Sequence, residues 1–162
     1  MQGKQSLDLD VITKVAEKFN TPQVSLFNLR TCFIFIISFA GLMRCDEIIP
    51  VNRSHVSIFP NHMSILCPKR KNDQRSQGHY FYFVRSDKIT CPVSITEKLL
   101  SKLPDKPAQP LVCRLSSKGT ALQHSISYSR VRRIFRETIS IFVKDCNRFG
   151  THSLKKEGCY CV

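Results

Sequence analysis

The longest apolar run of the sequence, residues 31–43 (TCFIFIISFAGLM), limits the possible folds more than any other feature. Its thirteen residues are too few to span a bilayer, which requires about 20 residues as a helix. In a helix the apolar side chains would point in almost every direction, so neighbouring elements must cover it all round. The run therefore predicts a helix over residues 23–40, ended by Gly41, in the centre of a core.

Residue patterns on either side predict further elements. Helical spacing of apolar residues predicts helices over 7–19, from 44 to just before Pro50, over 93–103 and over 125–143. β-branched and aromatic runs predict strands over 56–59, 63–67 and 79–85, and residues 104–110 form a proline-rich loop. With 42% apolar residues the chain can bury a real core. We expect one α+β domain over residues 1–162, mostly helical, with helices around a small three-stranded antiparallel sheet.

The charge is distributed unevenly along the chain. The net charge is +13, yet residues 1–50 carry five basic and five acidic side chains. Residues 51–162 carry twenty basic and seven acidic groups, so the whole excess lies there. This distribution makes a polyanion the first partner to test, although an ordinary solvated basic surface explains the charge equally well.

The eight cysteines do not form a recognisable metal-binding motif. No CxxC pair is present, so we expect no metal and no cofactor. The first twenty residues contain no continuous apolar segment of the kind a secretory signal needs. We therefore expect reduced thiols, an intracellular location and no membrane partner.

Three short motifs occur in a fixed order: GLMRCDE at 41–47, KNDQ at 71–74 and GTHSLKKEG at 150–158. With the order helices, three-stranded sheet, helices, they resemble the catalytic domain of the tyrosine recombinases, the phage-integrase family. The closest resemblance is to the DIRS and Crypton branch of mobile elements. The resemblance covers residues 5–160 and implies DNA breakage and rejoining during integration as the ancestral activity.

The resemblance implies a role for each matched residue. Arg44 corresponds to the first family arginine, whose guanidinium can clamp the non-bridging oxygens of a phosphodiester transition state, and Glu47 would orient or balance it. Lys71 corresponds to the lysine that protonates the leaving 5′ oxygen, and His152 to the histidine that assists proton transfer. Lys155 stands at the second family arginine and lacks its planar fork. Structural alternatives stay open: a surface pair for Arg44 and Glu47, a solvated or phosphate-contacting loop for Lys71, and a cap for His152.

Basic side chains near these motifs are candidates for DNA contact. Four arginines crowd the first half of the helix over 125–143, where they oppose the helix dipole, so contact with phosphate is one reason for their presence. A solvated helix face is the alternative for each. The candidates are Lys69, Arg70, Arg75, Arg130, Arg132, Arg133, Arg136 and Arg148.

No tyrosine matches the family nucleophile, because Tyr160 lies too close to the third motif and the sequence ends ten residues after His152. We expect a truncated, degenerate domain that is inactive as a lone chain, binds double-stranded DNA and lies in the nucleus. Self-association, or a full-length recombinase that supplies a tyrosine, is a further possibility. The alternatives are a non-enzymatic DNA-binding or regulatory module and an inert fragment.

Overall fold

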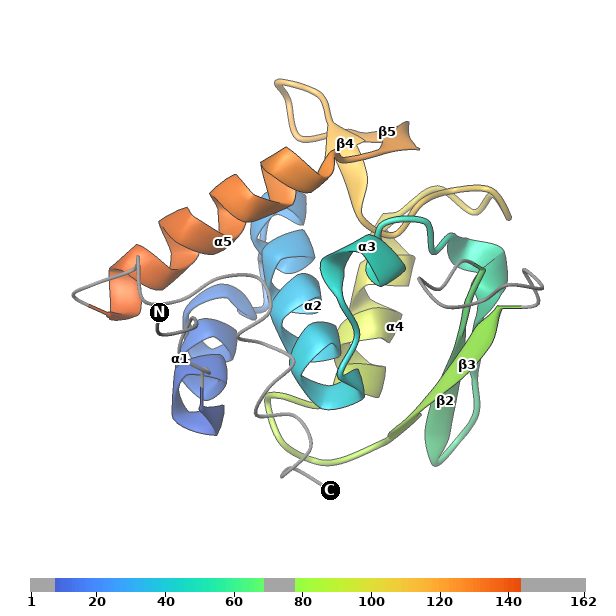
Figure 1. Ribbon diagram of the computed structural model, residues 1–162, viewed down its shortest axis with the longest axis horizontal. Helices are drawn as coiled ribbons and strands as arrows, with labels where there is room; N and C mark the ends of the chain where they lie inside the picture. The colour runs from blue at the N-terminus through green and yellow to red at the C-terminus, as the bar shows by residue number, and fades with distance from the viewer. Residues whose placement is uncertain (1–7, 69–77, 144–162) are drawn as a thin grey trace, which may run out of the picture.

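The computed structural model describes residues 8–68 and 78–143 (Figure 1). In this part of the chain there are five α-helices, one short 3-10 helix and five strands. The helices are α1 (Leu9–Phe19), α2 (Leu26–Gly41), α3 (Cys45–Ile48), η1 (Arg53–His55), α4 (Pro92–Lys102) and α5 (Tyr128–Phe142). The strands are β1 (Val56–Ile58), β2 (His62–Cys67), β3 (His79–Val84), β4 (Cys113–Leu115) and β5 (Ala121–Ser125).

Helix α2 is the central element, as its sequence predicts. Every residue from Leu29 to Phe39 is buried, including the polar Arg30, Thr31 and Ser38. Helices α1, α3 and α4 pack against it, and α4 lies on the side facing the three-stranded sheet (Figure 1). The helix begins at Leu26 rather than at residue 23, because the Ser25 hydroxyl accepts a hydrogen bond from the Asn28 backbone N–H and caps it. None of the described helices is long and apolar enough to cross a membrane.

The predicted antiparallel sheet is confirmed, with strand order β1-β2-β3. Met63 of β2 lies opposite Phe83 of β3, and Ile65 lies opposite Phe81. These side chains face the core, where Met63, Ile65 and Phe83 are almost fully buried. The side chains of β3 that point the other way, including Tyr80 and Tyr82, are exposed.

A second sheet, the β4–β5 hairpin, was not predicted from the sequence. Its strands have three and five residues, too few for a clear alternation. Gly119, with φ +81°, lies in the connection between them. Because strand β5 was not recognised, the predicted start of the last helix at residue 125 was wrong. Ser125 is the last residue of β5, and the helix starts at Tyr128 after its cap Ser127.

The turn that follows α2 also differs from the expectation. Gly41 is the last residue of the helix, and Leu42 adopts the left-handed conformation, with φ 57°. Gly41 serves close packing instead: a Cβ there would lie 2.6 Å from two ring atoms of Phe83. The glycine therefore lets the sheet approach the end of α2, immediately before Arg44.

Candidate nucleic-acid interface

Arg44 occupies the N-cap position of α3 and is half-buried. Its carbonyl accepts hydrogen bonds from the backbone N–H groups of Glu47 (3.0 Å) and Ile48 (3.1 Å). The Glu47 carboxylate Oε1 in turn accepts the backbone N–H of Arg44 at 2.9 Å. This is the return bond of a capping box, from the third helical residue to the cap. Glu47 thus positions Arg44 through its main chain, whereas the sequence suggested an effect on the guanidinium.

Burial distinguishes this pair from an ordinary surface ion pair. Glu47 is only 4% exposed, although a carboxylate is rarely buried without partners. Cys45 and Ile48 of the same short helix are buried as well, so α3 is anchored on both sides of Glu47. The backbone at Arg44 is consequently held in place by its capping box and by the buried side chains that follow it.

Helix α3 contacts both α2 and α5, so the fold brings the Arg44 segment next to the arginine-rich helix. Residues 44 and 130 are far apart in sequence, so the contact between the two helices forms only in the folded chain. The segment that holds Arg44 and the arginine-rich helix are therefore neighbours in the described part of the chain.

Helix α5 presents an apolar face to the core and a basic face to solvent. Val131, Phe135 and Ile139 are buried, and the Phe135 ring stacks on Phe35 of α2 with 5.4 Å between ring centroids. The four arginines Arg130, Arg132, Arg133 and Arg136 are all exposed. Since a helix turns by about 100° per residue, the last three lie within about 100° of one another around the helix, on its solvent-exposed side. A guanidinium group can donate paired hydrogen bonds to a phosphate.

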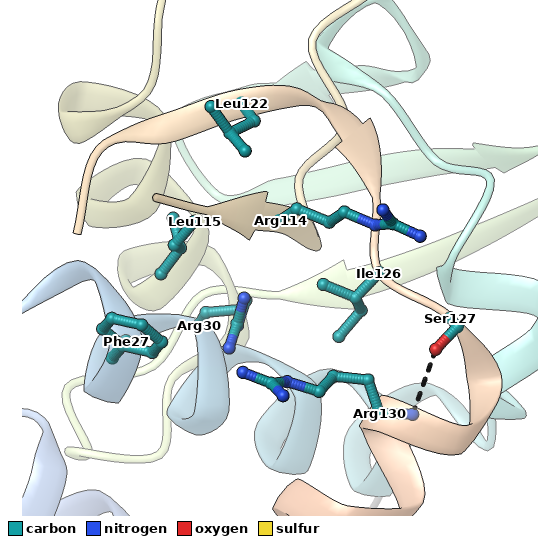
Figure 2. A pocket seen from close by; sticks show the side chains of 8 residues that line it. All are labelled: Phe27, Arg30, Arg114, Leu115, Leu122, Ile126, Ser127 and Arg130. Atoms are coloured by element: carbon teal, nitrogen blue, oxygen red, sulfur yellow. Dashed lines mark hydrogen bonds between the residues drawn. The ribbon is translucent and has the colours of Figure 1, made fainter. Parts of the chain in front are cut away.

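Two further arginines near this helix were missed by the sequence analysis. Arg30 of α2 and Arg114 of β4 line a pocket of about 300 Å³ together with Arg130 (Figure 2). The sequence did contain a sign that Arg30 is unusual, because it is the one basic residue within the predicted helix over 23–40. Arg114 had no signal, because the strand that carries it was not recognised. The remaining lining residues are Phe27, Leu115, Leu122, Ile126 and Ser127.

Arg30 is an unusual cation because it is 3% exposed. Its Nη1 donates to the Cys113 carbonyl at 2.8 Å, and its Cζ lies 5.3 Å from the centroid of the Phe27 ring. Its Nε has no hydrogen-bond partner within residues 8–68 and 78–143. Burial lowers the pKa of Arg30, and the nearby positive charge of Arg130 lowers it further.

The other predicted site residues fall outside the residues that the structure describes. They are Lys69, Arg70, Lys71, Arg75, Arg148, His152 and Lys155. Their roles stay predictions from the motifs.

Among the described side chains no group of three His, Cys, Asp or Glu residues is arranged to hold a metal ion. Burial raises the pKa of the Cys32 and Cys45 thiols to about 12, so neither is a ready thiolate ligand. The chemistry that these residues offer is instead that of cations: an exposed basic helix face, a fixed arginine beside it, and a buried arginine in a pocket. Such arrays bind phosphate groups.

The fold resembles those of solved recombinase structures. A XerH site-specific recombinase bound to difH substrate, in a pre-cleavage complex, aligns with a TM-score of 0.67 and 14% identity over 99% of this chain and 43% of that chain. The XerH post-cleavage complex aligns with a TM-score of 0.58 and 16% identity over 97% of this chain and 41% of that one. An Flpe–Holliday junction complex aligns with a TM-score of 0.59 and 14% identity over 94% and 38%.

These likenesses confirm the predicted fold class, an α+β arrangement of the tyrosine-recombinase catalytic-domain type. The chain spans less than half the length of each of these recombinases. No protein-family model and no curated protein sequence matches it.

Proposed function

We propose that this chain is a DNA-binding domain of the tyrosine-recombinase type. The observation that carries the proposal is the end-to-end likeness to a recombinase bound to its DNA substrate, with a TM-score of 0.67 over 99% of the chain. The arginine pattern supports it, because α5, which carries four exposed arginines, contacts the short helix α3 that Arg44 caps. We call Arg132, Arg133 and Arg136 the outer arginines of α5. In this proposal Arg44 and the outer arginines contact the phosphates of one duplex.

The electrostatics favour contact with the DNA backbone. Helix α5 carries four arginines and one glutamate, so its charge is +3. Backbone contacts of this kind give affinity that falls linearly on a logarithmic salt scale, because each neutralised phosphate releases counterions. Contacts to phosphates carry no direct sequence information, so we propose that binding through α5 is largely independent of sequence.

We further propose that these 162 residues by themselves do not transfer DNA strands. Lys155 takes the place of the second family arginine, and a lysine cannot make the paired, planar contact to a phosphate. Within the printed sequence no tyrosine corresponds to the nucleophile of the motif pattern. A mobile-element origin of the DIRS or Crypton kind and a nuclear location complete the proposal, and both rest on the motifs alone.

A salt titration tests DNA binding. Fluorescence anisotropy of a labelled 20–30 base-pair duplex, measured from low to physiological salt, should show affinity that falls steeply with salt concentration. An inert fragment would not bind even at low salt, and that result would overturn the proposal.

A suicide DNA substrate tests the proposed inactivity separately. After incubation, a denaturing gel should show no covalent protein–DNA adduct from the chain alone. An adduct would show that a nucleophile is present and would refute the inactivity, while leaving DNA binding intact. An adduct that forms only when a full-length recombinase is added would indicate a tyrosine supplied by that partner.

A further inference from the structure

A pocket lies between α2, the β4–β5 hairpin and the start of α5. The proposed DNA binding through Arg44 and the outer arginines of α5 does not involve this pocket. Arg30, Arg114 and Arg130 reach it from three different elements (Figure 2). The Arg30 and Arg130 guanidinium groups point toward each other across it, and the positive charge of Arg130 opposes that of the buried Arg30. Like charges held together in this way are costly unless an anion joins them.

The buried arginine is the strongest observation. Arg30 is more than nine-tenths buried, and its Nε has no hydrogen-bond partner among the described residues. A buried polar group without a partner costs free energy, and the cost is larger for a charged group. The Cys113 carbonyl and the Phe27 ring satisfy only part of the guanidinium.

Nearby carboxylates do not supply the missing counter-charge. None of the described residues that line the pocket is acidic. Glu137 lines the neighbouring pocket, which Arg30 also borders, yet no ion pair joins Glu137 to Arg30 in the described part of the chain. Within residues 8–68 and 78–143, no carboxylate compensates the positive charge of the pocket.

We propose that this pocket binds a phosphate group. A carboxylate can take one paired contact from a single guanidinium, whereas a tetrahedral phosphate offers oxygens to several arginines that approach from different directions. The N-terminus of α5, at Ser127, adds the positive end of its helix dipole to the same pocket. Phe27, Leu122 and Ile126 line the rest of the pocket, so there is also apolar surface for an organic group that bears the phosphate.

The phosphate has two possible sources, a free phosphate or phosphomonoester and a backbone phosphate of DNA. The inference concerns the shared group and does not depend on the proposed DNA binding. The experiments below distinguish the sources.

The first experiment measures thermal unfolding of the full chain against inorganic phosphate at constant ionic strength, balanced with sodium chloride. The balance is essential because any salt screens a chain of net charge +13. Specific binding should raise the unfolding temperature with the logarithm of phosphate concentration. The Arg30 Nε–H resonance should shift over the same range in a ¹H–¹⁵N spectrum.

Variants at exposed positions keep the test readable, because Arg30→Gln could fail to fold. Arg114→Gln and Arg130→Gln should each weaken phosphate binding roughly tenfold, since each removes a charge-assisted hydrogen bond. Lys118→Gln is the matched control: it removes one positive charge from the connection of the same hairpin, outside the pocket. Its phosphate affinity should stay within about twofold of the wild type.

Competition with a DNA duplex identifies the source. If duplex and phosphate exclude each other, and the pocket variants reduce the salt slope of DNA binding, the pocket takes a backbone phosphate. If both bind together, it takes a free phosphate. The proposal is overturned if phosphate has no effect at constant ionic strength, or if the two pocket variants and Lys118→Gln respond alike. Failure to bind DNA would contradict the proposed function alone.

Discussion

The Glu47 carboxylate accepts the backbone N–H of Arg44 at 2.9 Å, three residues upstream. An arginine and a glutamate at this spacing on a helix surface usually suggest an ion pair between side chains. Here the glutamate is buried and fixes the main chain of the arginine instead. The position of Arg44 therefore depends on a hydrogen bond that its own side chain does not make.

Replacement of Glu47 should separate the hydrogen bond from the charge. Glu47→Ala removes the acceptor and should lower the free energy of unfolding by about 1–2 kcal/mol, as the loss of other helix caps does. Glu47→Gln keeps an oxygen at the same place and should cost less than about 1 kcal/mol. Urea denaturation measures both. Asp46→Ala, an exposed change in the same helix, should stay within about 0.5 kcal/mol of the wild type.

Equal losses in the glutamine and alanine variants would contradict this account. They would show that the carboxylate acts through its charge.

The contact between Gly41 and Phe83 predicts a coupled pair of substitutions. Gly41→Ala would place a Cβ 2.6 Å from the Phe83 ring and should cost about 1–3 kcal/mol, as other overpacked sites do. Phe83→Leu shortens the side chain, so the double variant should lose less than the sum of the single losses. Denaturant unfolding of the wild type and the three variants completes the cycle.

Gly119→Ala provides the comparison for a glycine needed for its backbone angle. Nothing lies within 4 Å of a Cβ there, but φ is +81°. We expect a loss of roughly 1 kcal/mol from the left-handed conformation and no coupling to Phe83→Leu. Coupling at Gly119, or none at Gly41, would show that the packing argument is wrong.

Stability should also depend on pH through His55. Its Nδ1 accepts the Asn52 backbone N–H at 3.1 Å, and burial lowers its pKa from the ordinary value of 6.5. Because the folded state disfavours the protonated ring, the unfolded chain takes up the proton first. Stability is therefore fully present above about pH 6.5 and is lost as the pH falls through the lower, folded pKa.

His55→Asn should reduce this loss of stability between about pH 7 and pH 5. The variant keeps a side-chain acceptor but does not titrate in this range. Thermal unfolding at a series of pH values, at fixed ionic strength, gives the comparison with the wild type. Identical pH profiles would exclude His55 as the source.

The sequence predicts the parts of this fold that long, strongly patterned segments build. The apolar run around Phe35 predicted a covered helix, and the alternation in β3 predicted a strand with one exposed face, as Tyr80 and Tyr82 show. The hairpin β4–β5 was not predicted because its strands are short and carry exposed polar side chains such as Arg114 and Gln123. Its position depends on tertiary contacts, such as the bond from Arg30 to the Cys113 carbonyl.

The candidate site was predictable only in part. The first motif identified Arg44, the crowded arginines identified the basic helix, and the fold brings α3 and α5 into contact. Spacing did not show that Glu47 would be buried, because burial depends on what α3 packs against. Nor did it reveal the pocket, since Arg30, Arg114 and Arg130 are far apart in the chain and meet only after folding.

The outer arginines of α5 should determine the salt dependence of DNA binding. Arg132→Gln/Arg133→Gln removes two exposed charges from the solvent side of α5. If each contacts one phosphate, the slope of log affinity against log salt should fall in magnitude by about 0.9 per contact, hence by about 1.8. Anisotropy titrations at several salt concentrations measure this slope. Because both side chains are exposed, thermal stability should change little.

Lys102→Gln, at the end of α4, is the control for a general loss of charge. Helix α4 packs against α2 and β3, and α5 against α1 and α3, so Lys102 belongs to a different part of the surface. The control should leave the salt slope unchanged within error if DNA lies along α5. Equal reductions by the control and by the α5 double variant, per charge removed, would mean that DNA is attracted by net charge alone. The basic face of α5 would then be a solvated surface rather than an interface.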